Sequence, residues 1–304
     1  MNVVSFYRFF EVSDPVRVAT RIREEFENLN LVGTLLIATE GVNGTLAHPN
    51  LETLKDAIQL VESTTGTKSL RAKYSTAKDN NPVFYRLKVK VRDEIIQFGK
   101  SITASDPIGV HVSAREWNEL LDDPDVLVLD IRNDYEIEAG AFEGAVSIGI
   151  DRFSEFERRA ADLLAQHGKS SIAMYCTGGI RCEKASNAML EHGFGSVYQL
   201  DGGVLGYLET VDPNESRWHG ECFVFDQRVS VDANLAQGSY DQCHACRRPI
   251  SETDKQSKLY EKSVSCPHCF YETSEQQKAE FTERAKQEAL AKVRGDRHVG
   301  APQT

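Results

Sequence analysis

A cysteine, two glycines and an arginine fall within six consecutive residues near the middle of the chain, and a second cysteine follows directly. The whole segment reads Cys176-Thr177-Gly178-Gly179-Ile180-Arg181-Cys182. A thiolate is the reactive form of a cysteine, and its pKa falls beside a cation or at a helix N-terminus. Backbone N–H groups of a turn that opens a helix also favour an anion. The segment therefore predicts a reactive thiolate at Cys176, with Arg181 as the neighbouring cation.

Three residues near this loop have two interpretations each. Cys182 opens the helix that follows the loop, and it either forms a disulfide with an oxidised Cys176 or packs as a small apolar residue. Asp130 and Arg132 end a neighbouring apolar strand. They either shape the pocket of the loop or form an ion pair that fixes it. The sequence leaves both alternatives open.

Four of the seven cysteines form two C-x-x-C pairs in the last third of the chain. Cys243 and Cys246 are separated by nineteen residues from Cys266 and Cys269, a spacing typical of a tetrahedral structural zinc site. The alternatives are a reduced thiol cluster and a reversible pair of disulfides. Thiol or metal chemistry of this kind predicts a reducing compartment, and therefore a cytoplasmic protein.

A short strand with alternating charge is the candidate surface for a polyanion. Between residues 85 and 92 apolar and basic side chains alternate, so the basic ones share one face. Two more basic residues precede this strand and are expected beside it, which predicts a phosphate-contacting RNA surface. Its members are Arg71, Lys73, Arg86, Lys88, Lys90 and Arg92. The alternative is a solvated face, or an edge strand that lysine protects from aggregation.

The overall charge and the apolar pattern exclude several partners. The formal net charge is −11, so a polyanion cannot be attracted by net charge, and any contact with RNA must be local. No apolar run approaches the ~20 residues that a membrane-spanning helix needs. The N-terminus lacks the basic start of a signal peptide. We expect no membrane partner and no DNA partner.

The elements that must position these residues fall into three segments. Residues 1–100 show the order β-α-β-β-α-β, which is the ferredoxin-like pattern, with a turn expected at 40–44. Residues 107–212 alternate helices with strands near 126–131, 146–149, 171–176 and 196–200, which predicts a parallel α/β sheet. The loop at Cys176 follows one of these strands, where open α/β sheets place their ligands. Residues 213–304 contain the four-cysteine module and a charged helix.

The central segment resembles a rhodanese domain. Its loop from Cys176 to Arg181 has the six-residue length that this family uses for sulfur, whereas phosphatases of the same fold use seven residues. The stretch that contains Asp130, Arg132 and Glu136 is similar to the rhodanese sequence that leads to the next strand.

The whole chain resembles the bacterial tRNA uridine hydroxylases, a rhodanese-related family. The resemblance rests on the basic N-terminal segment, the rhodanese loop, the four-cysteine segment and the linking stretch 218–229. It implies oxygen-dependent hydroxylation of the wobble uridine of tRNA to 5-hydroxyuridine, with molecular oxygen as co-substrate. Cys176 matches the essential loop cysteine of the family.

Two other functions are compatible with the same residues. A sulfurtransferase would move persulfide sulfur from Cys176 to a small-molecule or RNA acceptor, and the loop chemistry supports it equally well. A non-enzymatic adaptor with a vestigial rhodanese domain conflicts with the intact Cys176 and Arg181. The sequence also does not decide whether Cys176 works as a persulfide, as an oxidised sulfur or as a covalent adduct to uridine.

Overall fold

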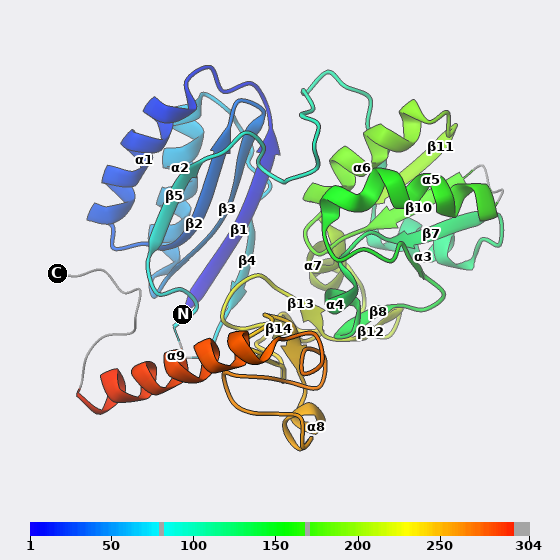
Figure 1. Ribbon diagram of the computed structural model, residues 1–304. Coiled ribbons are helices and arrows are strands. Elements are labelled where there is room, and N and C mark those ends of the chain that lie inside the picture. The colour runs from blue at the N-terminus through cyan, green and yellow to red at the C-terminus, as the bar shows by residue number, and fades with distance from the viewer. Residues whose placement is uncertain (79–81, 168–170, 295–304) are drawn as a thin grey trace.

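Two five-stranded sheets dominate the computed structural model, which describes residues 1–78, 82–167 and 171–294. They lie side by side, with a small cysteine-rich module below them in Figure 1. The N-terminal elements are β1 (Asn2–Phe9), α1 (Pro15–Asn28), β2 (Val32–Ala38), β3 (Gly41–His48), α2 (Leu51–Thr65), β4 (Lys73–Thr76) and β5 (Leu87–Val91). The predicted order β-α-β-β-α-β is confirmed by the elements from β1 to β4, and β5 is the basic strand expected between residues 85 and 92.

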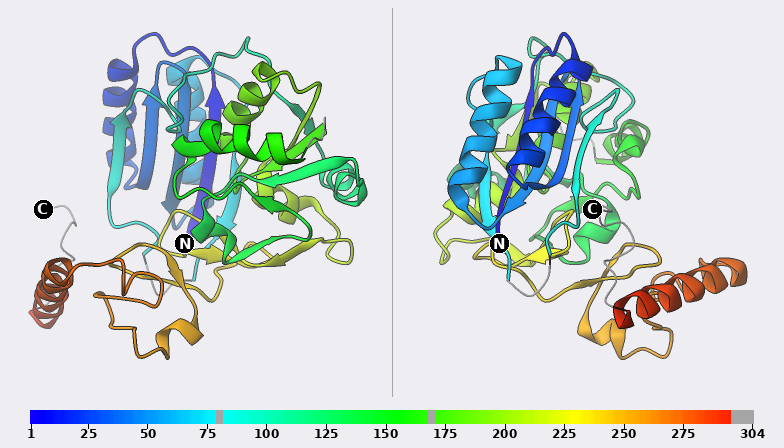
Figure 2. Two further views of the ribbon diagram at one scale, coloured as in Figure 1. Left: turned by 45° about the vertical axis from the view of Figure 1, so that its right-hand side comes forward. Right: turned by 90° about the vertical axis from the view of Figure 1, so that its left-hand side faces the viewer.

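The first sheet has the strand order β4-β1-β3-β2-β5. The first four of these strands pair antiparallel with their neighbours, whereas β5 runs parallel to β2 at the edge. Asp14 caps α1 by accepting from the N–H of Arg17, and Asn50 caps α2 in the same way. Both helices pack on one face of the sheet, where Ile22, Phe26 and other apolar side chains form the core. Figure 2 shows this one-sided cover from two directions.

The prediction of a turn at residues 40–44 is wrong, because β3 already begins at Gly41. Gly44 lies inside this strand, where a Cβ atom would stand 2.7 Å from the ring of Phe6. Glycine here makes room for a core aromatic side chain and does not mark a turn.

The second sheet has the order β6-β11-β10-β7-β9, and every neighbouring pair is parallel, as predicted. Its elements are β6 (Val110–Val112), α3 (Ala114–Asp122), β7 (Val126–Asp130), α4 (Asp134–Ile137), β8 (Gly140–Phe142), β9 (Val146–Ser147), a 3-10 turn (Phe153–Glu155), α5 (Phe156–His167), β10 (Ser171–Tyr175), α6 (Ile180–Glu191), β11 (Ser196–Leu200) and α7 (Gly203–Thr210). The three-residue strand β6 was not predicted.

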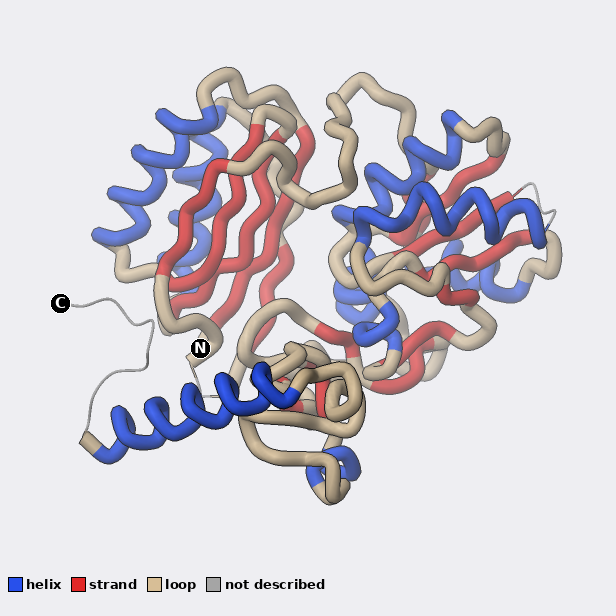
Figure 3. Tube along the Cα trace, viewed as in Figure 1, coloured by secondary structure: helices blue, strands red, loops and turns tan. Residues whose placement is uncertain are grey.

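The C-terminal segment consists mainly of loops, apart from the helix α9 that projects from it (Figure 3). Its elements are β12 (Trp218–Gly220), β13 (Cys222–Phe223), β14 (Ser230–Val231), β15 (Asp241–Gln242), β16 (Pro249–Ile250), α8 (Glu252–Lys255) and α9 (Glu275–Val293). Strand β12 pairs with β8, which attaches the segment to the second sheet. Among the described residues, no helix combines the length and the apolar character needed to cross a membrane.

A buried ion-pair cluster joins the two sheet domains. The ammonium group of Lys184 on α6 lies 2.9 Å from a carboxylate oxygen of Glu40 and 2.5 Å from one of Glu94. Lys184 is fully buried, so removing a partner would leave a charge without compensation. The cluster fixes α6, and with it the cysteine loop, against the N-terminal sheet.

Candidate active site

The loop between β10 and α6 encloses the sulfur of Cys176. The N–H of Gly179, which has the left-handed φ of 93°, donates to this sulfur at 3.1 Å. Burial raises the pKa of Cys176, but the Cys182 thiol, the charge of Arg181 and the loop N–H groups together lower it to about 6. Cys176 is therefore a thiolate at neutral pH. Burial and the neighbouring thiolate raise the pKa of Cys182 well above its ordinary value, so Cys182 stays protonated as the donor.

Glu136 is the partner of Arg181. Two hydrogen bonds of 2.6 and 2.8 Å join the guanidinium to this carboxylate, and Thr177 Oγ1 donates to it at 3.1 Å. Burial would raise the pKa of Glu136, and the charge of Arg181 overrides this and lowers it. Sequence reasoning quoted Glu136 only as part of the rhodanese resemblance. The sequence could have identified Glu136 as a structural residue, because a glutamate three residues after Asn133 is typical of a capping box at the start of a short helix.

Asp130 and Arg132 form an ion pair, which is one of the two alternatives that the sequence left open. Arg132 Nη2 lies 2.5 Å from Asp130 Oδ2, which also accepts from the hydroxyl of Tyr175 at 2.5 Å. Arg132 further donates to the carbonyl of Gly140 at 2.7 Å and stacks against Trp218. Both charged side chains are buried away from the cavity beside the loop. They hold β7 and the chain around α4, which carries Glu136.

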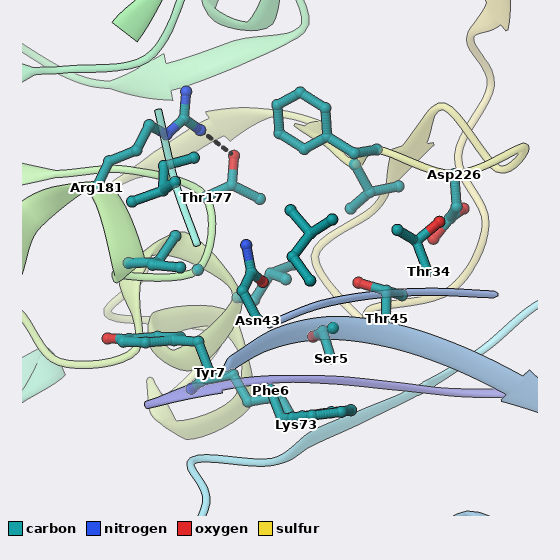
Figure 4. A pocket seen from close by; sticks show the side chains of 18 of the residues that line it. Ser5, Phe6, Tyr7, Thr34, Asn43, Thr45, Lys73, Thr177, Arg181 and Asp226 are labelled. Carbon is teal, nitrogen blue, oxygen red and sulfur yellow. Dashed lines mark hydrogen bonds between the residues drawn. The ribbon is translucent and has the colours of Figure 1, made fainter. Parts of the chain in front are cut away.

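A cavity of about 410 Å³ separates the loop from the helix-free face of the N-terminal sheet. Figure 4 shows Thr177 and Arg181 on one side of it and side chains of β1 and β3 on the other. Four of the seven residues from Cys176 to Cys182 line it, namely Thr177, Gly178, Ile180 and Arg181. Cys176 and Cys182 lie fully buried behind them.

Tyr7 of β1 reaches the loop from the N-terminal sheet. Its hydroxyl donates to Glu183 Oε1 at 3.2 Å, and it would stand 2.9 Å from a Cβ atom on Gly179. Burial and the charge of Glu183 raise the pKa of Tyr7 well above its ordinary value, so the hydroxyl keeps its proton. The sequence analysis placed the N-terminal segment and the Cys176 loop in separate domains and did not identify Tyr7. No local sequence pattern could have identified it, because only the docking of the two domains brings Tyr7 to the loop.

The six predicted basic residues do not form one surface. Arg71 and Lys73 lie at the β4 edge, line the cavity, and face Asp201 at 2.5 Å and Glu209 at 3.9 Å respectively. The other four lie along β5 at the opposite edge of the same sheet, namely Arg86, Lys88, Lys90 and Arg92. The expectation that the two groups are neighbours is wrong, because β4 pairs with β1 and β5 pairs with β2.

Part of the β5 row nevertheless faces the same side as the cavity. Lys88 is paired with Thr34 and Lys90 with Leu36, and both of these β2 residues line the cavity. Partners in a parallel pair point to the same face, so the two lysines extend the cavity wall outward. Burial and the neighbouring charges of Arg86 and Lys90 lower the pKa of Lys88.

The four cysteines of the C-terminal segment converge. The Sγ atoms of Cys243, Cys246, Cys266 and Cys269 all lie within 4.8 Å of one another. The Cys266 and Cys269 sulfurs are 3.7 Å apart, and those of Cys246 and Cys266 are 3.8 Å apart. Four ligands at a Zn–S distance of about 2.3 Å would be separated by roughly 3.8 Å in a tetrahedron. The donor set and its spacing therefore fit a metal ion of this kind.

Comparisons with known proteins match both sheet domains. Residues 1–95 match the UPF0176 acylphosphatase like domain, and residues 113–210 match the rhodanese-like domain. Among solved structures, a rhodanese-like domain from Anabaena sp. is 20% identical, covers 37% of this chain and 80% of its own, and has a TM-score of 0.30. An acylphosphatase from Bacillus subtilis is 13% identical, covers 30% of this chain and 99% of its own, and has a TM-score of 0.25.

One relative matches almost the full length. It is the tRNA uridine(34) hydroxylase of Teredinibacter turnerae, which is 42% identical over 301 residues, or 98% of this chain and 92% of the relative. A match of this extent includes both sheet domains and the cysteine-rich module. The chain therefore belongs to the tRNA uridine(34) hydroxylase family.

Proposed function

We propose that this protein hydroxylates the uridine at position 34 of tRNA at C5, giving 5-hydroxyuridine, with molecular oxygen as co-substrate and a two-electron donor, so that one oxygen atom enters the base and the other leaves as water. The relative that matches almost the full chain carries the name of this activity. The structural observation that supports it best is the cavity between the Cys176 loop and the N-terminal sheet, because residues that follow Cys176 line it together with a second domain that would hold the RNA. Cys176 is the proposed reactive group, and Arg181 keeps its sulfur ionised.

The proposed partner is tRNA, contacted locally and not through net charge. Arg71 and Lys73 at one sheet edge and the β5 row at the other would contact phosphates on either side of the cavity. The four cysteines of the C-terminal segment would hold a structural zinc ion, since four thiolates leave no coordination position for substrate. The cytoplasm is the proposed compartment, where tRNA and reduced thiols occur together.

Mass spectrometry of tRNA nucleosides from cells with and without this gene tests the proposal. Loss of 5-hydroxyuridine and its derivatives is the expected result. Growth under isotopically labelled dioxygen should place the label in the new hydroxyl group. Loss of thiolated nucleosides with 5-hydroxyuridine unchanged would instead identify a sulfurtransferase and refute the proposal.

A further inference from the structure

A short turn between β13 and β14 presents one aromatic side chain to solvent. The N–H of Val224 donates to the carbonyl of Val229 at 2.9 Å and closes the turn. Val224, Val229 and Phe223 are buried, whereas Phe225 is 62% exposed. The Phe225 ring meets the ring of Phe223 edge to face, with 5.2 Å between the ring centres, and this contact leaves most of Phe225 open to solvent.

Hydrogen bonds attach the turn and the strand before it to both sheet domains. Arg228 pairs with Asp226 at 2.7 Å and donates to Ser75 Oγ on β4, also at 2.7 Å. Arg228 and Asp226 are both buried. On the other side, Thr177 Oγ1 of the loop lies 3.5 Å from the carbonyl oxygen of Phe223. The backbone that carries Phe225 is thereby anchored, which reduces the conformational entropy lost when a ligand stacks on the ring.

Phe225 stands between two cavities. It lines the cavity of about 410 Å³ beside the loop and also a second cavity of about 260 Å³ beside the cysteine-rich module. The guanidinium of Arg181 lies 5.6 Å from the centre of its ring. Arg247 lines the second cavity, and its side chain is exposed.

We propose that Phe225 is a stacking platform for the bases of an RNA strand, with one base in each cavity. The base beside the loop is the target uridine, so the inference rests on the proposed function. The neighbouring nucleotide occupies the second cavity, where Arg247 meets its phosphate. Enzymes that modify a base take it out of its stack, and an aromatic side chain replaces the lost stacking. The cationic lining from Arg71, Lys73 and Arg247 favours a nucleic acid strand over an apolar peptide.

The test measures RNA binding in the full-length Cys176→Ser protein, so that no reaction takes place. The probe is an anticodon stem-loop with uridine at position 34 and fluorescent aminopurine as the adjoining base. We expect fluorescence quenching on binding. Phe225→Ala should weaken binding about tenfold or more and abolish the quenching, whereas Phe225→Trp should retain both. Tyr271→Ala is the matched control, since this tyrosine is 84% exposed but lines neither cavity.

Two results would overturn the inference. One is unchanged affinity and quenching in Phe225→Ala. The other is full binding and quenching in Phe225→Leu, because an apolar side chain without a π system would then suffice. Quenching by the protein in the absence of any effect of the gene on cellular 5-hydroxyuridine would refute the proposed function and leave the stacking role standing.

Discussion

At the scale of single residues, hydrogen-bond donors and one cation keep the Cys176 sulfur ionised. The side-chain donor is the thiol of Cys182, whose own pKa is raised, the backbone N–H of Gly179 also donates, and the cation is Arg181. Arg181 is in turn oriented by Glu136. Each of these groups is buried, so water cannot replace one that is lost.

Removing the thiol of Cys182, which donates a hydrogen bond to the Cys176 sulfur, should raise the pKa of Cys176. Thiolate absorbance should fall as pH drops through about 6 in the wild type, and in Cys182→Ala this fall should occur at higher pH. Cys182→Ser keeps a donor and should stay close to the wild type. The Cys176→Ser protein supplies the background from the other thiols. Identical titrations for Cys182→Ala and the wild type would show that Cys182 only packs.

Glu136→Gln should destabilise the protein by about 3–5 kcal/mol, because it leaves the charge of Arg181 buried without a carboxylate. Urea unfolding at neutral pH measures this. The control is Asp122→Asn, which breaks an exposed ion pair with Arg217 and should cost far less, because water screens the pair. Equal losses in both variants would contradict a special role for the buried pair.

The same pair makes a pH-dependent contribution to stability. The pKa of Glu136 is lower in the folded protein than in the unfolded chain, where it is about 4.3. Its contribution is therefore present above that value and is lost as pH falls through the folded-state pKa.

At the scale of elements, β5 is the edge strand whose lysines point toward the cavity side of the sheet. Replacing Lys88 and Lys90 by glutamine should weaken tRNA binding, and each lost phosphate contact should reduce the salt slope by about 0.7 to 0.9. Arg17→Gln with Lys55→Gln, on the helices that cover the opposite face, is the matched control. Unchanged affinity and slope in the β5 variant would mean that the strand is only a solvated edge.

Local patterns predicted most of the elements, because capping residues and apolar periodicity act within a few residues. They failed at Gly44, where the space needed by Phe6 from another strand decides the residue type. They also placed Arg71 wrongly beside the basic residues of β5, since strand order is a long-range property of the sheet. The Cys176 loop could be predicted from the sequence because its residues are consecutive. The role of Tyr7 could not be predicted, because this residue reaches the loop only through domain docking.

At the scale of the whole molecule, the site is assembled from three segments that lie far apart in the sequence. The buried ion pairs of Lys184 hold the two sheet domains against each other. The turn with Phe225 closes the cavity from the C-terminal side. The cysteine-rich module lines the second cavity beside this turn and has a small core of its own. That core contains Ile250 and the cysteines themselves.

One zinc ion per chain should therefore stabilise the module. Elemental analysis of protein purified without chelators should find it, and removal by a strong chelator should lower the melting temperature. Cys243→Ser should reproduce the loss of both zinc and stability, whereas Cys222→Ser, outside the cluster, should retain the zinc. Metal-free protein with an unchanged melting temperature would contradict the structural role.

The central claim is that the sulfur of Cys176 modifies tRNA uridine, and complementation tests it most directly. Cells that lack the gene receive either the wild type or Cys176→Ser at equal expression, and 5-hydroxyuridine is measured in their tRNA by mass spectrometry. We expect the wild type to restore the nucleoside and the serine variant, although folded and able to bind the stem-loop, to restore none. Restoration by Cys176→Ser to the wild-type level would contradict the account.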